Sequence, residues 1–186
     1  MNHKGTLRID TENLILRKFK LSDAEAMYKN WASDSEVTKF LTWNPIDSVE
    51  VSKSIIEGWV DEYKNNNIYQ WAIVSKNNGD EPIGAISVVR QDEEVSMVQV
   101  GYCIGRQWWN KGITSEALSA LIKFFINEVN VNRIEARFDP RNLNSGKVMM
   151  KCGMKYEGTM RKADKNNQGI CDSVMYSLLA EEYIRE

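Results

Sequence analysis

The sequence predicts an α/β fold, a sandwich of a mixed β-sheet with covering helices. Two kinds of segment predict it, and they are interleaved along the chain. Segments that alternate apolar and polar residues are typical of strands, and segments whose apolar residues recur three and four positions apart are typical of helices. The 186 residues, of which 42% are hydrophobic, are enough to bury a core without disulfides. We therefore expect a single domain over residues 1–186, with a core that spans about 7–181.

Two helices are expected in the first half of the chain, each starting at a capping box. The boxes are SDAE, beginning at Ser22, and DSVE, beginning at Asp47, because each pattern can satisfy free amides of a first helical turn. Apolar residues at helical spacing follow each box, over about 24–31 and 55–63. Both helices precede the main part of the sheet.

The remaining elements follow from the same two periods and from the polar turns between them. An early strand or strand pair is expected within 6–19. The later elements are an antiparallel meander over 69–104, a helix at 115–129, a strand at 133–138, a short helix at 144–152, and a closing hairpin around the turn NNQG.

Charge and cysteine content limit the classes of function. Lys and Arg number 24 and Asp and Glu 26, so the net charge of −2 gives no bulk attraction to nucleic acid or acidic membranes. The three cysteines lack the spacing of a zinc site or a disulfide scaffold, and we expect no metal. They indicate a reducing compartment. The N-terminus has no uninterrupted apolar run, which favours a cytoplasmic location.

A candidate anion site lies where the helix after residue 112 begins. Unpaired N–H groups and a partial positive charge make such an end suitable for phosphate. Gly112 would allow a ligand to approach the backbone, and Lys111 could add charge at the rim. The alternative is that the glycine only forms a turn and that the neighbouring tryptophans belong to the core or to a lid.

A second candidate stretch is DPRNLNSGKVMMKCGMKYEG, residues 139–158. Asn142 follows a predicted strand, and Ser145 stands three residues later at a helix start. For an isolated pattern of this kind, Asn142 or Asn144 would simply cap the helix.

Taken together, VGYCIGRQWWNKGITSEAL and NLNSGKVMMKCGMKYEG resemble the GNAT superfamily of acetyl-CoA-dependent N-acetyltransferases, in particular its RimJ/RimL-like branch of ribosomal-protein N-terminal acetyltransferases. The likeness covers nearly the whole chain. It implies a three-layer α/β/α sandwich whose mixed, mostly antiparallel sheet is splayed at its centre. It also implies transfer of acetyl from acetyl-CoA to a primary amine, which is a protein N-terminal α-amino group or a small-molecule amine.

The resemblance implies that the helix end holds the pyrophosphate of coenzyme A. Trp109–Thr114 matches the six-residue loop of the family, although Trp109 replaces its polar first residue and Thr114 its final small one. Main-chain binding should survive both changes. The implied cofactor-binding residues are Val100, Tyr102, Cys103, Trp109, Asn110, Lys111, Gly112, Ile113, Thr114, Ser115 and Asn142.

The resemblance also implies catalytic roles. Asn142 matches the asparagine that bonds the pantetheine side of the cofactor, and Ser145 matches the hydroxyl proposed to protonate the departing thiolate. In many relatives a glutamate occupies the position of Gln99, whose amide cannot accept a proton. Asp164 matches an acidic position of the Rim-type enzymes and is the first candidate for the general base.

Two other carboxylates remain open as the base. Glu116 is the second candidate, or a residue that stabilises the helix dipole, and Asp172 is the third, or a residue that fixes a turn. Cys103 has no histidine to activate it, so we expect direct attack by the amine in a ternary complex and no acyl-enzyme.

The acceptor pocket is expected to be built from the segment between the first two helices, WASDSEVTKFLTWNP, with the closing hairpin opposite. Trp31, Phe40 and Trp43 would form its aromatic wall, unless they belong to the core. The missing glutamate at Gln99 keeps open a non-catalytic acyl-CoA-binding sensor or interaction module. The oligomeric state is also open, with a homodimer as one option.

Overall fold

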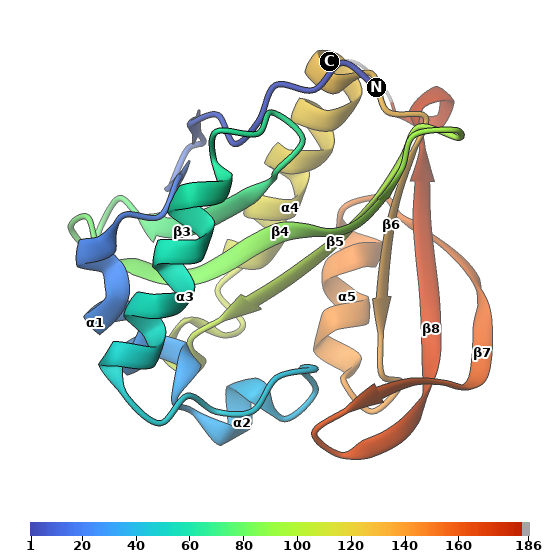
Figure 1. Ribbon diagram of the computed structural model, residues 1–186. Helices are drawn as coiled ribbons and strands as arrows, with labels where there is room; N and C mark the ends of the chain where they lie inside the picture. The colour runs from blue at the N-terminus through green and yellow to red at the C-terminus, as the bar shows by residue number, and fades with distance from the viewer. Residues whose placement is uncertain (184–186) are drawn as a thin grey trace.

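The computed structural model describes residues 1–183 and contains an eight-stranded sheet in the spatial order β1-β2-β3-β4-β5-β6-β8-β7 (Figure 1). Neighbouring strands pair antiparallel, except that β5 and β6 pair parallel. Helices cover the sheet on both faces. The predicted α/β fold class, with a mixed and mostly antiparallel sheet, is confirmed.

The first half of the chain forms a strand pair, a helical region and two strands of the meander. Its elements are β1 (Ile9–Asp10), β2 (Leu14–Arg17), α1 (Ala24–Met27), α2 (Ser35–Thr38), α3 (Val49–Glu62), β3 (Gln70–Ser75) and β4 (Pro82–Asp92). A π-helical segment, Tyr28–Ala32, continues α1. The early strand pair and both predicted helices are present, and α2 is an additional short helix that the sequence did not predict.

The second half completes the sheet and supplies the helices of the opposite face. Its elements are β5 (Met97–Ile104), α4 (Ile113–Phe124), β6 (Arg133–Phe138), α5 (Leu143–Lys151), β7 (Lys155–Asn166) and β8 (Gly169–Leu179). The meander, both helices and the closing hairpin agree with the predicted order. In the described residues, 1–183, no helix has the length and apolar character needed to span a membrane.

Both predicted capping boxes are wrong in position. The first helical turn begins at Leu21, and Asp23 accepts the main-chain N–H of Lys20 at 3.0 Å. The Asp23 carboxylate is held there because it is buried and paired with Arg17 at 2.7 Å. At α3 the cap is Ser48, whose hydroxyl accepts the N–H of Val51 at 3.4 Å, one residue after the expected Asp47.

The sheet opens between β5 and β6. The two strands pair only from Met97–Arg133 to Gln99–Glu135, and beyond that level they diverge into a V (Figure 1). At the same level β4 contains a bulge between Val88 and Arg90. Because a bulge bends a strand and increases its twist, it turns β5 away from β6. The splayed sheet that the family resemblance implies is therefore present.

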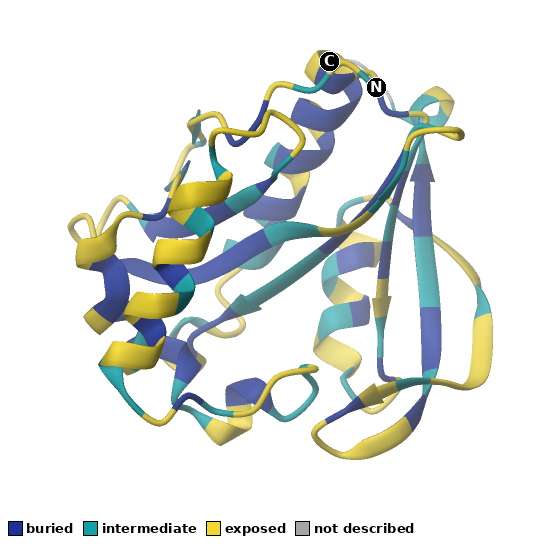
Figure 2. Ribbon diagram, in the orientation of Figure 1, coloured by how far each residue is buried: buried dark blue, intermediate teal, exposed yellow. Residues whose placement is uncertain are grey.

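Two groups of buried side chains hold the layers together. On β3, Trp71 and Ile73 face α4, while Ala72 faces α1 and α3. The alternation follows from the two-residue period of a strand with helices on both faces. Figure 2 shows the buried residues concentrated in the sheet and on the inner faces of the helices, whereas β7 is largely exposed at the sheet edge.

Candidate active site

Two cavities lie at the opening of the sheet and meet there. The first, of about 650 Å³, lies among the start of α4, the start of α5 and the segment after α2. The second, of about 870 Å³, lies between β5, the N-terminal helices and the β7–β8 hairpin. After the roles that the family resemblance implies, we call the first the cofactor cavity and the second the acceptor cavity. Both are lined by Phe40, Leu41, Tyr102 and Cys103, so these residues mark the junction.

The loop before α4 presents free main-chain N–H groups to the cofactor cavity. Asn110 and Gly112 both have positive φ, 60° and 77°, and Gly112 is the N-cap of α4. Within the described residues, the N–H groups of 111–115 make no hydrogen bond. A Cβ on Gly112 would find only the Lys151 ammonium within 4 Å, at 3.9 Å, so the space before the helix is open. This geometry suits a phosphate group.

Cations surround the same cavity. Its charged lining residues are Lys39, Lys111, Arg141, Lys147, Lys151 and a single carboxylate, Glu36. Among these cations, only Lys111 was predicted from the sequence to lie at the site. The spacing of Lys147 and Lys151, four residues apart on a predicted helix, is the signal that could have revealed a shared face. An excess of positive charge fits a ligand with several phosphates.

The residues predicted for the cofactor gather here with one exception. Trp109, Asn110, Lys111, Gly112, Ile113, Thr114, Ser115 and Asn142 all line the cofactor cavity, and Tyr102 and Cys103 lie at the junction. Val100 lines only the acceptor cavity. The indole of Trp109 donates to the carbonyl of Ile104 at 2.9 Å, so this residue also anchors the loop.

Asn142 and Ser145 stand at the start of α5. Asn142 occupies the N-cap position, but its side chain makes no capping hydrogen bond, which leaves the amide free toward the cavity. The Ser145 hydroxyl lies 3.1 Å from the phenol oxygen of Tyr102, which also donates to the Ser145 carbonyl at 3.0 Å. Tyr102 thus reaches across the V from β5 to α5.

Burial keeps both polar side chains of β5 at the junction neutral. It raises the pKa of the Tyr102 phenol well above its usual range, although the contact with Ser145 lowers that pKa in part. Burial also raises the pKa of the Cys103 thiol to about 12. Near neutral pH, Tyr102 is therefore a hydrogen-bond donor and Cys103 is a protonated thiol, which is a poor nucleophile.

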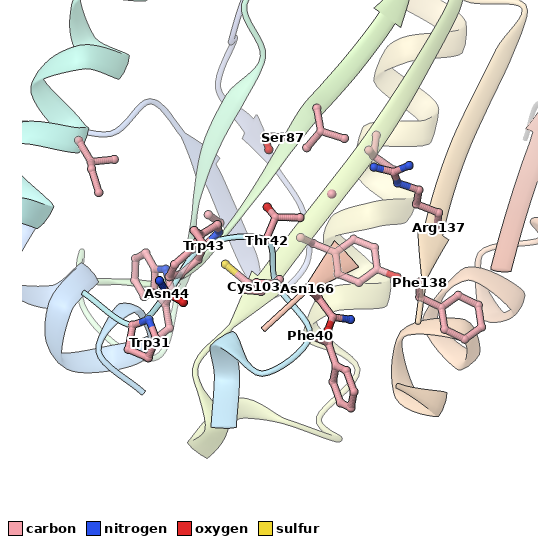
Figure 3. Close-up of a pocket in the computed structure, with 18 of the residues that line it drawn as sticks. Trp31, Phe40, Thr42, Trp43, Asn44, Ser87, Cys103, Arg137, Phe138 and Asn166 are labelled. Atoms are coloured by element: carbon pink, nitrogen blue, oxygen red, sulfur yellow. The ribbon is translucent and has the colours of Figure 1, made fainter. Parts of the chain in front are cut away.

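The acceptor cavity has aromatic walls. Trp31, Phe40 and Trp43, the predicted wall, all line it, together with Trp59 and Phe138. Figure 3 shows Trp31 and Trp43 on one side, Arg137 and Phe138 on the other, and Phe40 and Asn166 near its lower end. Trp31 is also a core residue, 1% exposed, so the cavity wall at this position is part of the packed core.

Asp164 is the candidate base that lies in the acceptor cavity. It is on β7, at a register shift between Met160 and Asp164, and its side chain is 23% exposed. One carboxylate oxygen lies 3.3 Å from Nε of Arg137, and the other accepts the main-chain N–H of Lys165 at 2.8 Å. Arg137 was not among the site residues predicted from the sequence.

The two other candidate bases lie outside both cavities. Glu116 accepts hydrogen bonds from the Thr11 hydroxyl at 2.6 Å and from the Asn13 main chain at 2.8 Å, so it joins α4 to the β1–β2 turn. Burial raises the pKa of Glu116, but these hydrogen bonds outweigh it and the net pKa is lowered. Asp172 accepts the N–H of Lys162 at 2.9 Å, where Lys162 has a positive φ of 53°. Both contacts are structural, but they differ from the expected ones: Glu116 joins two elements, and Asp172 holds the irregular part of β7 and not the turn NNQG.

Two buried polar residues that line the acceptor cavity have no role predicted from the sequence, Gln99 and Asp139. Gln99 is 3% exposed and lies opposite Glu135 at the last paired position of β5 and β6. The Asp139 carboxylate is buried and accepts hydrogen bonds from Arg141 and Asn166. The Arg141 guanidinium holds the pKa of Asp139 far below its usual range. The short spacing from Asp139 to Arg141 was visible in the sequence, but its tie to Asn166 was not.

Residues 13–155 match the family model of the acetyltransferase (GNAT) domain. The chain belongs to the GNAT acetyltransferase family. Membership of the GNAT family makes it an N-acetyltransferase and confirms the resemblance drawn from the two motifs. The helix-start loop and the Asn142–Ser145 stretch both fall inside the matched range.

Known GNAT proteins resemble the chain over most of its length. The uncharacterized N-acetyltransferase p20 of Bacillus licheniformis is 35% identical over 93% of this chain and 96% of its own. The ribosomal protein uS5-alanine N-acetyltransferase of Escherichia coli is 26% identical over 82% of this chain and 80% of its own. The crystal structure of a GNAT-family acetyltransferase from Bacillus anthracis superposes with a TM-score of 0.81 at 28% identity, over 95% of this chain and all of that one.

Proposed function

We propose that the chain transfers acetyl from acetyl-CoA to a primary amine by direct attack in a ternary complex. The observation that carries the proposal is the meeting of the two cavities at Tyr102 and Cys103. One cavity is cationic and ends at a helix N-terminus, whereas the other is aromatic and contains Asp164. An acyl donor and an amine that enter from opposite sides would meet at this junction.

The residues of the cofactor cavity fit acetyl-CoA. The free N–H groups of 111–115 and the lysines Lys111, Lys147 and Lys151 would hold its phosphates. The free amide of Asn142 would bond the pantetheine arm toward the junction. When bound, acetyl-CoA supplies the thioester carbonyl that the amine attacks.

Ser145 would donate a proton to the leaving thiolate. Its hydroxyl faces the junction, and the phenol of Tyr102 beside it remains protonated at neutral pH. The phenol can therefore orient the serine hydroxyl and support it when its proton moves.

Asp164 would receive the proton of the amine, directly or through water. A primary amine is mostly an ammonium ion near neutral pH, so it must lose a proton before it attacks. Asp164 is the one of the three candidate carboxylates that lines the acceptor cavity. Arg137 restrains its carboxylate and so would fix the direction in which it accepts the proton.

Two classes of acceptor follow from the proposal, a protein N-terminal α-amino group and a small-molecule amine. The relative from Escherichia coli is named for the alanine of ribosomal protein uS5, which supports the first class. The aromatic cavity, of about 870 Å³, has room for an amine of either class.

The test is release of coenzyme A thiol from acetyl-CoA against a panel of amines. The panel contains small primary amines, peptides with a free N-terminus and the same peptides with a blocked N-terminus. We expect thiol release with at least one free amine, together with one acetyl group on that amine by mass spectrometry. Binding of acetyl-CoA without transfer to any amine would support the non-catalytic acyl-CoA-binding module instead.

A further inference from the structure

At the open end of the V, one residue makes three hydrogen bonds between the two arms. Asn167 lies in the turn between β7 and β8, and its side-chain amide donates to the carbonyls of Thr38 at 2.9 Å and Trp43 at 2.8 Å. Its main-chain N–H donates to the carbonyl of Leu41 at 3.1 Å. One residue therefore binds three carbonyls of a segment that is more than a hundred positions away in the sequence. We call residues 38–43 the clamped segment.

The clamped segment forms part of the junction. Phe40 and Leu41 line both cavities, and Trp43 lines the acceptor cavity. Beyond the last residue of α2, the segment consists of turns and bends with no regular secondary structure. Such a segment depends on contacts with other elements to hold one conformation. Three of these contacts come from Asn167.

The other side of the clamp is rigidly held. Asn166, the residue before Asn167, is buried, and its amide donates to Asp139 at 2.8 Å. Asp139 follows the last residue of β6 and is buried and bonded to Arg141. Asp139 at the end of β6 thus holds Asn166 by a hydrogen bond, and the next residue, Asn167, holds the clamped segment by three more.

We infer that Asn167 is a positioning residue that closes the junction, an inference that rests on the proposed function. β5 bounds the junction on one side with Tyr102 and Cys103, and the clamped segment bounds it on the other with Phe40 and Leu41. A closed junction would align the amine with the thioester and would keep water from the thioester. Because a misplacement of about 1 Å can cost about 10²-fold in rate, three hydrogen bonds at this point are enough to control transfer.

The direct test replaces the donor of the clamp at constant size. In Asn167→Asp the side-chain nitrogen becomes an oxygen that faces the carbonyls of Thr38 and Trp43, so attraction becomes repulsion. The matched control is Gln168→Ala, in the same turn, where the exposed residue bonds through its main-chain N–H to Asn166. Asn167→Ala provides a second variant, which removes the donor without adding repulsion.

Three readouts separate positioning from a general loss of structure. We expect kcat/KM for the acceptor to fall about tenfold or more in Asn167→Asp, and thiol release without acetylated amine to rise as a share of turnover, because water reaches the thioester. The dissociation constant of coenzyme A should change less than about threefold, because most residues that line the cofactor cavity belong to α4, α5 and the segments just before them. Hydrogen exchange of amides 38–43 should accelerate, whereas the core strands keep their protection.

The outcomes distinguish this inference from the proposed function. If the wild type acetylates an amine, and Asn167→Asp and Asn167→Ala match it in transfer and hydrolysis, the clamp has no role in positioning. If the wild type acetylates no amine, the proposed function fails. In that case unchanged exchange of residues 38–43 in Asn167→Asp also overturns the clamp.

Discussion

The two cavities that meet at Tyr102 and Cys103 are built in different ways. The cofactor cavity takes much of its lining from one continuous run, Trp109–Ser115, and offers main-chain N–H groups to its ligand. The acceptor cavity is lined by side chains from β4, β5, β6, β7, α3 and the clamped segment. Recognition of the donor is thus encoded locally, whereas recognition of the acceptor depends on tertiary packing. The two should respond differently to substitution.

The largest effect is expected on the acceptor side, at Asp164. Asp164→Asn removes the proton acceptor at nearly constant size and should lower kcat/KM for the amine by roughly 10²-fold or more. The acidic limb of the pH profile of kcat/KM should disappear with it. Glu116→Gln and Asp172→Asn, assayed with the same acceptor, are the controls. A near-normal rate in Asp164→Asn with a defect in either control moves the base to that residue.

At the junction, Ser145→Ala should lower kcat by roughly 10²-fold and leave the affinity for acetyl-CoA nearly intact, the pattern of an interaction lost from the transition state. Tyr102→Phe keeps the ring and removes only the oxygen that contacts Ser145, so its loss of kcat should be smaller. Steady-state kinetics and calorimetry on the same preparations measure both quantities. Normal turnover in Ser145→Ala would return Ser145 to a purely structural position in α5.

On the donor side, Gly112→Val should raise the dissociation constant of coenzyme A about tenfold or more, roughly 1.4 kcal/mol, because a branched side chain fills the space before α4. Valine is also strained at the φ of 77°. Gly79→Val is the matched control, since Gly79 has a φ of 68°, open space around it and no place in either cavity. Equal affinities in the two folded variants, measured by calorimetry, would contradict the phosphate site.

The smallest effect concerns stability alone. Glu116→Gln should cost about 1–2 kcal/mol, because charge-assisted hydrogen bonds to Thr11 and Asn13 weaken, with kcat unchanged. The pKa of Glu116 is lowered by folding, so its contribution is present at neutral pH and is lost as the pH falls through the folded-state pKa. Denaturant unfolding of wild type and variant should therefore converge toward low pH. A constant difference down to low pH would argue against this role.

The contrast between a locally encoded cavity and one built by tertiary packing also explains which features could be predicted from the sequence. The order of strands and helices and the helix start at Gly112 follow from local patterns, and the order is confirmed. The place of Ser145 beside the cofactor was implied by the family resemblance alone. The first cap was misplaced because Asp23 is held by Arg17, a partner outside the local pattern.

Other parts of the site depend on long-range contacts that no local pattern encodes. Arg137 on β6 meets Asp164 on β7 across β8, the strand that pairs with both of them. Asn167 was visible in the sequence only as a residue of the polar turn NNQG. Its three partners, the carbonyls of Thr38, Leu41 and Trp43, become evident only in the folded chain, where the β7–β8 turn reaches the segment after α2.

Initial-rate kinetics with acetyl-CoA and the best amine of the panel both varied test the junction most directly. If both ligands occupy their cavities at once and the protonated Cys103 takes no part, the double-reciprocal lines intersect, and Cys103→Ala retains the intersecting pattern. Parallel lines, together with an acetyl group on the protein in the absence of amine, would contradict direct transfer between the two cavities.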